Sequence, residues 1–205
     1  MKNIKMIFVL SLLLMSCKKE DSGVTPISQT ESLSDYFPMT VGSYWIYKVY
    51  GADTSLTFTE NGVDTVFVDK DSTVNGISYK VFRGPFYNIS LLRDSAGIIV
   101  NSDGGRIFSL NTELPFINND YLVDSMYHST STLSNSDSTF LVPAGSFTAK
   151  HINGKITYKF NEPQYLKVRY YKSAYSKNVG LVYKRTMYLN GPGYLEFKLL
   201  QYKIK

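Results

Sequence analysis

The chain has 205 residues, of which 43% are hydrophobic and 19% are charged, and its formal net charge is +5 at pH 7. This mild charge gives no reason to expect nucleic acid as a partner. Cys17 is the single cysteine, so no disulfide can form within one chain.

The first sixteen residues are typical of a secretory signal peptide. Two lysines precede an apolar run over residues 6–15, and a small serine precedes Cys17. The run is shorter than the roughly 20 residues that span a bilayer, so a permanent transmembrane helix is not expected. Leu-Met-Ser-Cys at 14–17 resembles the bacterial lipobox, in which the cysteine thiol is acylated and becomes the new N-terminus. This resemblance predicts lipidation (palmitate) at Cys17, and the alternative is an incidental thiol in an ordinary signal peptide.

Residues 17–34 are predicted to be the lipidated cysteine and a flexible tether, because the segment is rich in Ser, Thr and Gly and such a composition cannot bury apolar surface. Lys-Lys-Glu-Asp at 18–21 resembles signals that send some Gram-negative lipoproteins to the outer cell surface. We therefore expect an outer membrane lipoprotein at the cell surface, with the periplasmic face as the alternative. Residues 35–205 are long enough for a single β-rich domain with its own core.

Strand patterns dominate this domain. Polar and apolar residues alternate over 155–160 and over 165–170, as in half-buried strands, and the second run places Tyr170 on the inner side. Asn-Gly pairs at 61–62, 75–76 and 153–154 each separate two such runs and predict hairpin turns. Further reversals are predicted at 95–97, 103–105 and 190–193.

The last run, residues 194–204, changes phase midway and predicts a β-bulge near Leu199 and Leu200. Ten or more strands joined mainly by hairpins would leave exposed edges in a flat sheet. We therefore predict an all-β fold, an antiparallel meander that forms a strongly curved sheet, half-barrel or barrel. A two-sheet β-sandwich is the alternative.

Charge is distributed unevenly along the chain. Residues 20–140 carry 15 acidic and 6 basic side chains, whereas residues 141–205 carry 2 acidic and 12 basic ones. The excess of bases could form a face for an anionic lipid, glycan or protein. We favour the alternative that basic strands lie beside acidic ones and form cross-strand pairs.

Signatures of chemistry are weak. There is no Gly-x-Ser-x-Gly elbow, and the two histidines, His128 and His151, are isolated in sequence and are interpreted as a loop residue and a surface or turn residue. No metal-ligand spacing or phosphate loop is recognisable, so neither a metal nor a cofactor is predicted. Glu196 is flanked by apolar residues but is expected to face outward with Lys198. A carboxylate pair that meets only in the fold leaves a hydrolase as an alternative.

Aromatic residues are abundant, with 17 Tyr, 12 Phe and one Trp. Tyrosine combines a broad apolar face with a polar tip, which suits it to sugar or peptide surfaces. The simpler interpretation is that aromatic residues favour strands and fill cores. Four tyrosines in one region are the candidate ligand-surface residues: Tyr165, Tyr170, Tyr171 and Tyr175.

Three segments together resemble a family of uncharacterised Gram-negative exported lipoproteins. They are YFPMTVGSYWIY at 36–47, VPAGSF at 142–147 and NVGLV at 178–182. Members are similar, more loosely, to lipoprotein-carrier (Lol-type) half-barrels. The resemblance brings no assigned catalytic residues, and the roles that the residues of these motifs suggest are structural.

The sequence therefore predicts a non-enzymatic lipid-anchored module that binds a hydrophobic, glycan or protein ligand and contacts the membrane through its anchor. The alternatives are a Lol-like carrier of lipid or lipoprotein, or envelope-assembly factor, and the hydrolase described above.

Overall fold

The computed structural model describes residues 31–53, 55, 57–85, 87–111, 116–118, 127–158, 168–188 and 191–205. Within them, Glu31–Lys205 form one compact unit. Two predicted site residues, Cys17 and Tyr165, lie outside the described residues. The tyrosines at 170, 171 and 175 lie within them.

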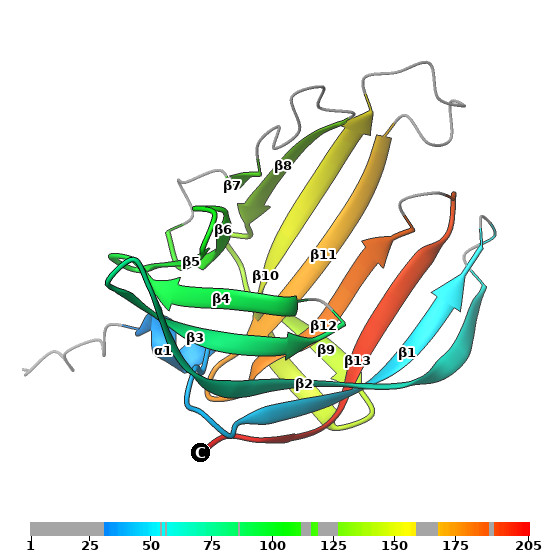
Figure 1. Ribbon diagram of the computed structural model, residues 1–205. Coiled ribbons are helices and arrows are strands. Elements are labelled where there is room, and N and C mark those ends of the chain that lie inside the picture. Colours follow the sequence, from blue (N-terminus) through cyan, green and yellow to red (C-terminus); the bar gives the residue numbers. More distant parts are fainter. Residues whose placement is uncertain are drawn as a thin grey trace, which may run out of the picture. The chain divides into compact units, whose positions relative to one another are not determined.

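The described residues form one antiparallel sheet of thirteen strands, preceded by a single helical turn (Figure 1). This confirms the predicted all-β meander. The elements are α1 (Leu33–Tyr36), β1 (Tyr44–Ala52), β2 (Phe58–Val74), β3 (Ile77–Gly84), β4 (Asn88–Asp94), β5 (Ile98–Asn101), β6 (Arg106–Ser109), β7 (Phe116–Asn118), β8 (Tyr127–Leu133), β9 (Ser138–Val142), β10 (Gly145–Tyr158), β11 (Val168–Ser176), β12 (Gly180–Met187) and β13 (Tyr194–Lys203).

The spatial order of the strands is β6-β5-β4-β3-β2-β1-β13-β12-β11-β10-β8-β7, with β9 paired only to β10. The first and last long strands, β1 and β13, are therefore neighbours in the middle of the sheet. At the ends of the order, β6 and β7 approach each other, but no ladder joins them in the described part of the chain. The sheet is open and strongly curved, which is one of the forms predicted for the meander.

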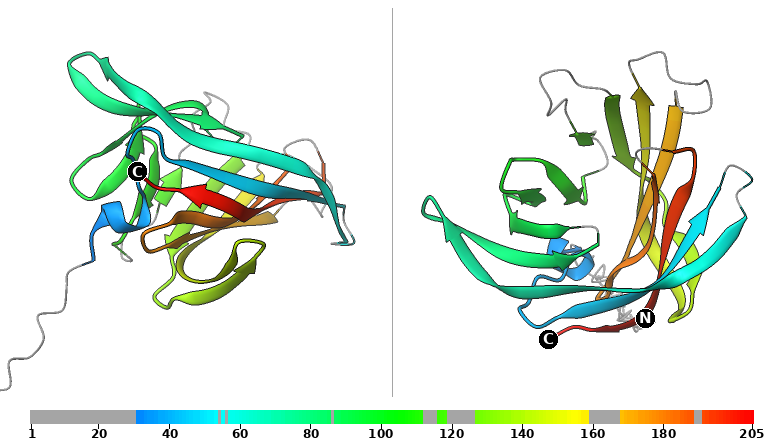
Figure 2. Two further views of the ribbon diagram at one scale, coloured as in Figure 1. Left: turned by 90° about the horizontal axis from the view of Figure 1, so that it is seen from below. Right: turned by 45° about the vertical axis from the view of Figure 1, so that its right-hand side comes forward.

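Curvature brings two halves of the sheet face to face: the strands β1 to β6 and the strands β7 to β13. Figures 1 and 2 show β3 and β4 running across the direction of β10 and β11. The rings of Phe108 on β6 and Tyr175 on β11 lie 4.4 Å apart between centroids, so the halves touch through side chains. The core lies between them, and β1, for example, buries Trp45, Tyr47 and Val49 at alternate positions.

Turn chemistry is only partly as predicted. Asn75 and Gly76 connect β2 to β3 with φ values of 52° and 79°, as the hairpin prediction requires. The predicted turns at 61–62 and 153–154 are wrong, since both pairs lie inside long strands, β2 and β10. At 61–62 the register shifts between Val49 and Tyr50 of β1, so this pair forms a bulge.

The orientation of β11 also differs from the prediction. Arg169 is buried, whereas the side chain of Tyr170 is 62% exposed and points away from the inner face. Pairing with β10 sets this orientation, since Arg169 lies opposite Ile156 and Tyr171 opposite Gly154.

Both histidines lie in strands rather than in a loop or turn. His128 is exposed on β8. His151 on β10 is buried against the ring of Phe140, and burial lowers its pKa. The interpretation of His151 as a surface or turn residue is therefore wrong, because Phe140 on β9, which pairs with the first part of β10, packs against it.

The bulge predicted in the last strand is present. Ile46 of β1 pairs with Gln201 and Tyr47 pairs with Leu199, so Leu200 is the extra residue. Leu199 is fully buried, whereas Tyr202 beyond the bulge is 38% exposed. The bulge therefore changes the phase of the strand without burying every apolar residue after it.

Acidic and basic halves of the chain meet around α1 and beside the β9–β10 hairpin, where Lys150 Nζ lies 3.4 Å from Asp137 Oδ1. Lys150 Nζ on β10 lies 3.0 Å from Glu31 Oε2, and Lys177 Nζ lies 3.6 Å from Asp35 Oδ2. Both contacts are at least partly exposed, so each is worth little by itself. Their effect is to hold the N-terminal turn against the C-terminal strands.

Candidate ligand site inside the curved sheet

A narrow cavity opens on the inner face of the sheet beside Trp45. Its free space is about 20 Å³, roughly the room of one water molecule. Residues from both halves of the sheet and from the segment after α1 line it: Phe37, Pro38, Trp45, Tyr47, Val66, Phe82, Tyr87, Tyr175, Gly180 and Leu181.

The polar atoms of two aromatic residues in this wall are bonded to backbone carbonyls. Trp45 Nε1 donates to the carbonyl of Val179 at 2.6 Å, and the Tyr47 hydroxyl donates to that of Leu181 at 2.8 Å. Burial raises the pKa of Tyr47 well above its ordinary value, so it stays neutral. The two side chains therefore offer the cavity their apolar ring faces.

The segment after α1 closes one side of the cavity. Phe37 contacts three rings, with centroid distances of 5.7 Å to Phe82, 6.1 Å to Phe108 and 5.8 Å to Tyr175. Pro38 lies against Gly180, where an added Cβ would come within 3.1 Å of its ring. This segment is not a strand, so it reaches the core without pairing into the sheet.

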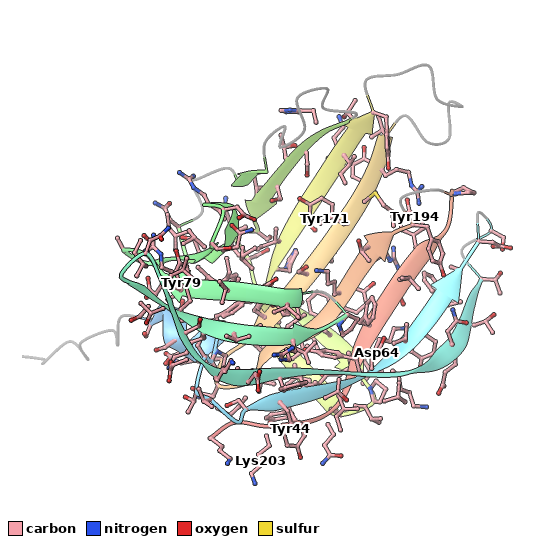
Figure 3. The ribbon with its side chains drawn as sticks, in the orientation of Figure 1. Tyr44, Asp64, Tyr79, Tyr171, Tyr194 and Lys203 are labelled. Carbon is pink, nitrogen blue, oxygen red and sulfur yellow. The ribbon has the colours of Figure 1, made fainter. Side chains whose placement is uncertain are left out.

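The structure separates the predicted ligand-surface tyrosines. Tyr175 is buried in the cavity wall. Tyr171, which Figure 3 labels, lies four residues away on the same face of β11. Tyr170 is on the opposite face, and Tyr165 lies outside the described residues. Two of the four therefore share the inner face.

Beyond the cavity, the inner face becomes polar. The Tyr171 ring covers Gly154, where a Cβ would lie 1.9 Å from the ring, and its hydroxyl is 3.2 Å from Ser129 Oγ. Lys184 on β12 pairs with Ser173 of β11, and burial lowers its pKa to about 8. The inner face thus also carries hydroxyl groups and an amine, on residues that do not line the cavity.

Glu196, the acid singled out from the sequence, shares its strand face with Lys198 as expected but is buried rather than exposed. Tyr183 donates to Glu196 Oε1 at 2.5 Å, and Arg185 and Lys198 pair with the carboxylate at 2.5 and 3.0 Å. Burial would raise the pKa of Glu196, but these bonds outweigh it and lower the pKa. This is the arrangement of a structural ion-pair network.

Over the described ranges, no three His, Cys, Asp or Glu side chains are grouped so that they could hold a metal ion. In the same part of the chain, every helix is too short or too polar to cross a membrane.

Sequence reasoning did not single out Phe37, Trp45, Phe82 and Tyr87 as site residues. Two of them belong to the segment 36–47, which had been noticed only as a family resemblance. The same is true of Gly180 and Leu181 in the segment 178–182. Residues of these two segments meet in the cavity wall. The occurrence of both segments in one chain is therefore the sequence signal that could have pointed to this site.

Comparison of the sequence with protein-family models and with curated proteins found no match. Among solved structures, the chain is similar to a candidate lipoprotein from Parabacteroides distasonis, with 16% identity and a TM-score of 0.46 over 85% of this chain and 100% of that one. It is also similar to a candidate exported protein with a YmcC-like fold from Bacteroides fragilis, with 13% identity and a TM-score of 0.42 over 82% of this chain and 98% of that one.

Proposed function

We propose that this chain is an exported, lipid-anchored envelope protein that binds an apolar ligand, without catalysis, in the cavity beside Trp45. The single observation that carries the proposal is the apolar cavity whose wall combines both halves of the curved sheet. Concave sites with mostly apolar and aromatic walls are the usual ligand sites of proteins.

The size of the cavity limits how a ligand can enter. About 20 Å³ is far below the roughly 300–1,000 Å³ of typical ligand pockets. An acyl chain or ring can therefore bind only where the wall gives way. Phe37 and Pro38 are the best candidates for this movement, because they and Tyr87 are the described wall residues that lie outside the strands. A Lol-like carrier that encloses whole acyl chains is less well supported by a cavity of this size.

Trp45 provides a direct reporter of binding, because it is the only tryptophan of the chain and lines the cavity. We expect dibromostearate to quench its fluorescence saturably, whereas unbrominated stearate should compete without quenching. Val66→Phe, which fills the cavity, should weaken binding at least tenfold. Val63→Phe is the matched control on the same strand, where the side chain is 54% exposed, and should change binding less than twofold.

Two outcomes would contradict this proposal. One is quenching that rises linearly without saturation, and the other is equal behaviour of the Val66 and Val63 variants. Circular dichroism of the Val66 variant must first show that it is folded, since overpacking a core often destabilises it. Native mass spectrometry of the untagged chain after gentle extraction then tests independently for a co-purified lipid.

The proposed location depends on Cys17. Replacing it with alanine should move the chain from the membrane fraction to the soluble fraction and abolish labelling by radioactive palmitate. A single acyl chain binds membranes weakly, so the several chains of the lipobox pathway would account for stable anchoring. Because the chain has one cysteine, unchanged membrane association of the variant would exclude the anchor as the attachment.

A further inference from the structure

A second hollow lies at the end of the sheet where β3 begins and β4 ends. It has a volume of about 240 Å³, and Tyr79, Arg93, Leu92, Ser78 and Met39 are among the residues that line it. Figure 3 shows Tyr79 at this end of the sheet. None of its lining residues belongs to the cavity beside Trp45, so the two sites are separate.

Arg93 is the unusual residue of this hollow. Its guanidinium carbon lies 5.8 Å from the centroid of the Tyr79 ring, and its Nε is buried without a hydrogen-bond partner. Buried donors without an acceptor are rare in native proteins, and each such group calls for an explanation, such as an absent ion or ligand.

The acids that line the hollow are engaged elsewhere. Asp71 Oδ1 lies 2.5 Å from Lys80 Nζ, and Asp94 Oδ1 accepts the backbone N–H of Gly97 at 2.8 Å. Neither acid forms an ion pair with Arg93, and no other acid in the described part of the chain does so. The guanidinium is thus left facing an aromatic ring without a carboxylate.

We propose that this hollow binds a small organic anion, with its carboxylate or phosphate group on Arg93. The guanidinium fork matches the geometry of both groups and can bond two oxygens at once. Tyr79, Leu92 and Met39 provide apolar surface for the body of the ligand. A volume of about 240 Å³ lies below the usual range for drug-sized ligands, which limits the ligand to a few heavy atoms beyond the anionic group.

The Arg93 Nε–H group is its own reporter, since a buried N–H is visible in nitrogen–proton correlation spectra. We expect benzoate or inorganic phosphate to shift this resonance saturably in the labelled full chain. Benzamide, the uncharged analogue of benzoate, and sodium chloride at matched ionic strength should leave it in place. Arg93→Lys should weaken anion binding at least tenfold, as followed by the backbone amides of Tyr79 and Leu92.

Arg106→Lys is the matched control, because Arg106 is exposed on β6 and does not line the hollow. It should change binding less than twofold. A response to benzoate alone identifies carboxylates as the ligand class, and a response to phosphate alone identifies phosphates. The proposal is overturned if neither anion shifts the resonance, if benzamide or chloride shifts it equally, or if the two arginine variants behave alike.

Discussion

Replacing Phe37 with alanine is expected to lower the free energy of unfolding by about 3–5 kcal/mol, the usual cost of truncating a buried phenylalanine. Phe37 is 4% exposed and contacts Phe82, Phe108 and Tyr175, which come from both halves of the sheet. Its loss therefore removes contacts on several sides at once and leaves a space that the sheet cannot close by a local shift.

The same substitution tests whether Phe37 occupies space that a ligand needs. Phe37→Ala should bind dibromostearate at least fivefold more tightly than the natural chain, because the ring no longer has to be displaced. Chemical denaturation gives the stability change, and quenching of Trp45 gives the affinity. Phe67→Ala is the control, since Phe67 is 37% exposed on β2, and it should cost less than about 1 kcal/mol. A similar stability loss in both variants would show that Phe37 does not join the two halves.

Replacing Arg169 with methionine is expected to destabilise the fold by about 2–5 kcal/mol, because each buried acceptor that loses its donor costs about 1–3 kcal/mol. Arg169 is 2% exposed, and its Nη1 and Nη2 donate to the carbonyls of Gly191, Pro192 and Gly193 at 2.9, 2.7 and 2.7 Å. Its guanidinium carbon also lies 4.4 Å from the centroid of the Tyr194 ring.

These contacts tie β11 to the connection that leads into β13. Methionine fills a similar space but removes the donor of the Gly191 and Pro192 carbonyls, whereas the Gly193 carbonyl keeps the backbone N–H of Tyr188. The unpaired carbonyls account for most of the expected loss of stability. Arg169→Lys should lose most of the same stability, because an ammonium group lacks the planar fork. Arg106→Met is the control, because Arg106 is exposed. Its free energy of unfolding, followed by thermal denaturation, should stay within about 0.5 kcal/mol of that of the natural chain. Unchanged unfolding of the Arg169 variants would mean that this connection is held by other contacts.

Several features of the fold could be predicted from local sequence. Alternation of polar and apolar residues identified an all-β chain because a strand exposes and buries successive side chains. The hairpin at Asn75 and Gly76 and the bulge at Leu200 were also correct. Each depends on a few neighbouring residues: a pair that tolerates positive φ, or a change of phase within one run.

Other predictions failed because distant pairing overrode local preference. Asn-Gly permits a tight turn but does not require one, and Gly154 instead leaves room within β10 for the ring of Tyr171. Pattern alone placed Tyr170 inside, whereas the register with β10 buries Arg169. A charged residue can be buried there only because three carbonyls from a segment more than twenty residues away surround it.

The sequence alone thus determined the strand-forming character of the chain, because backbone propensity and side-chain alternation are local. It also predicts the lipid anchor at Cys17, which lies outside the described residues. The tertiary structure decided which aromatic residues form the cavity, since Phe37, Trp45 and Tyr175 are far apart in sequence and meet only when the sheet curves. It likewise brought Tyr79 and Arg93 together from two strands. Curvature and register depend on contacts across the whole sheet, and no short segment contains them.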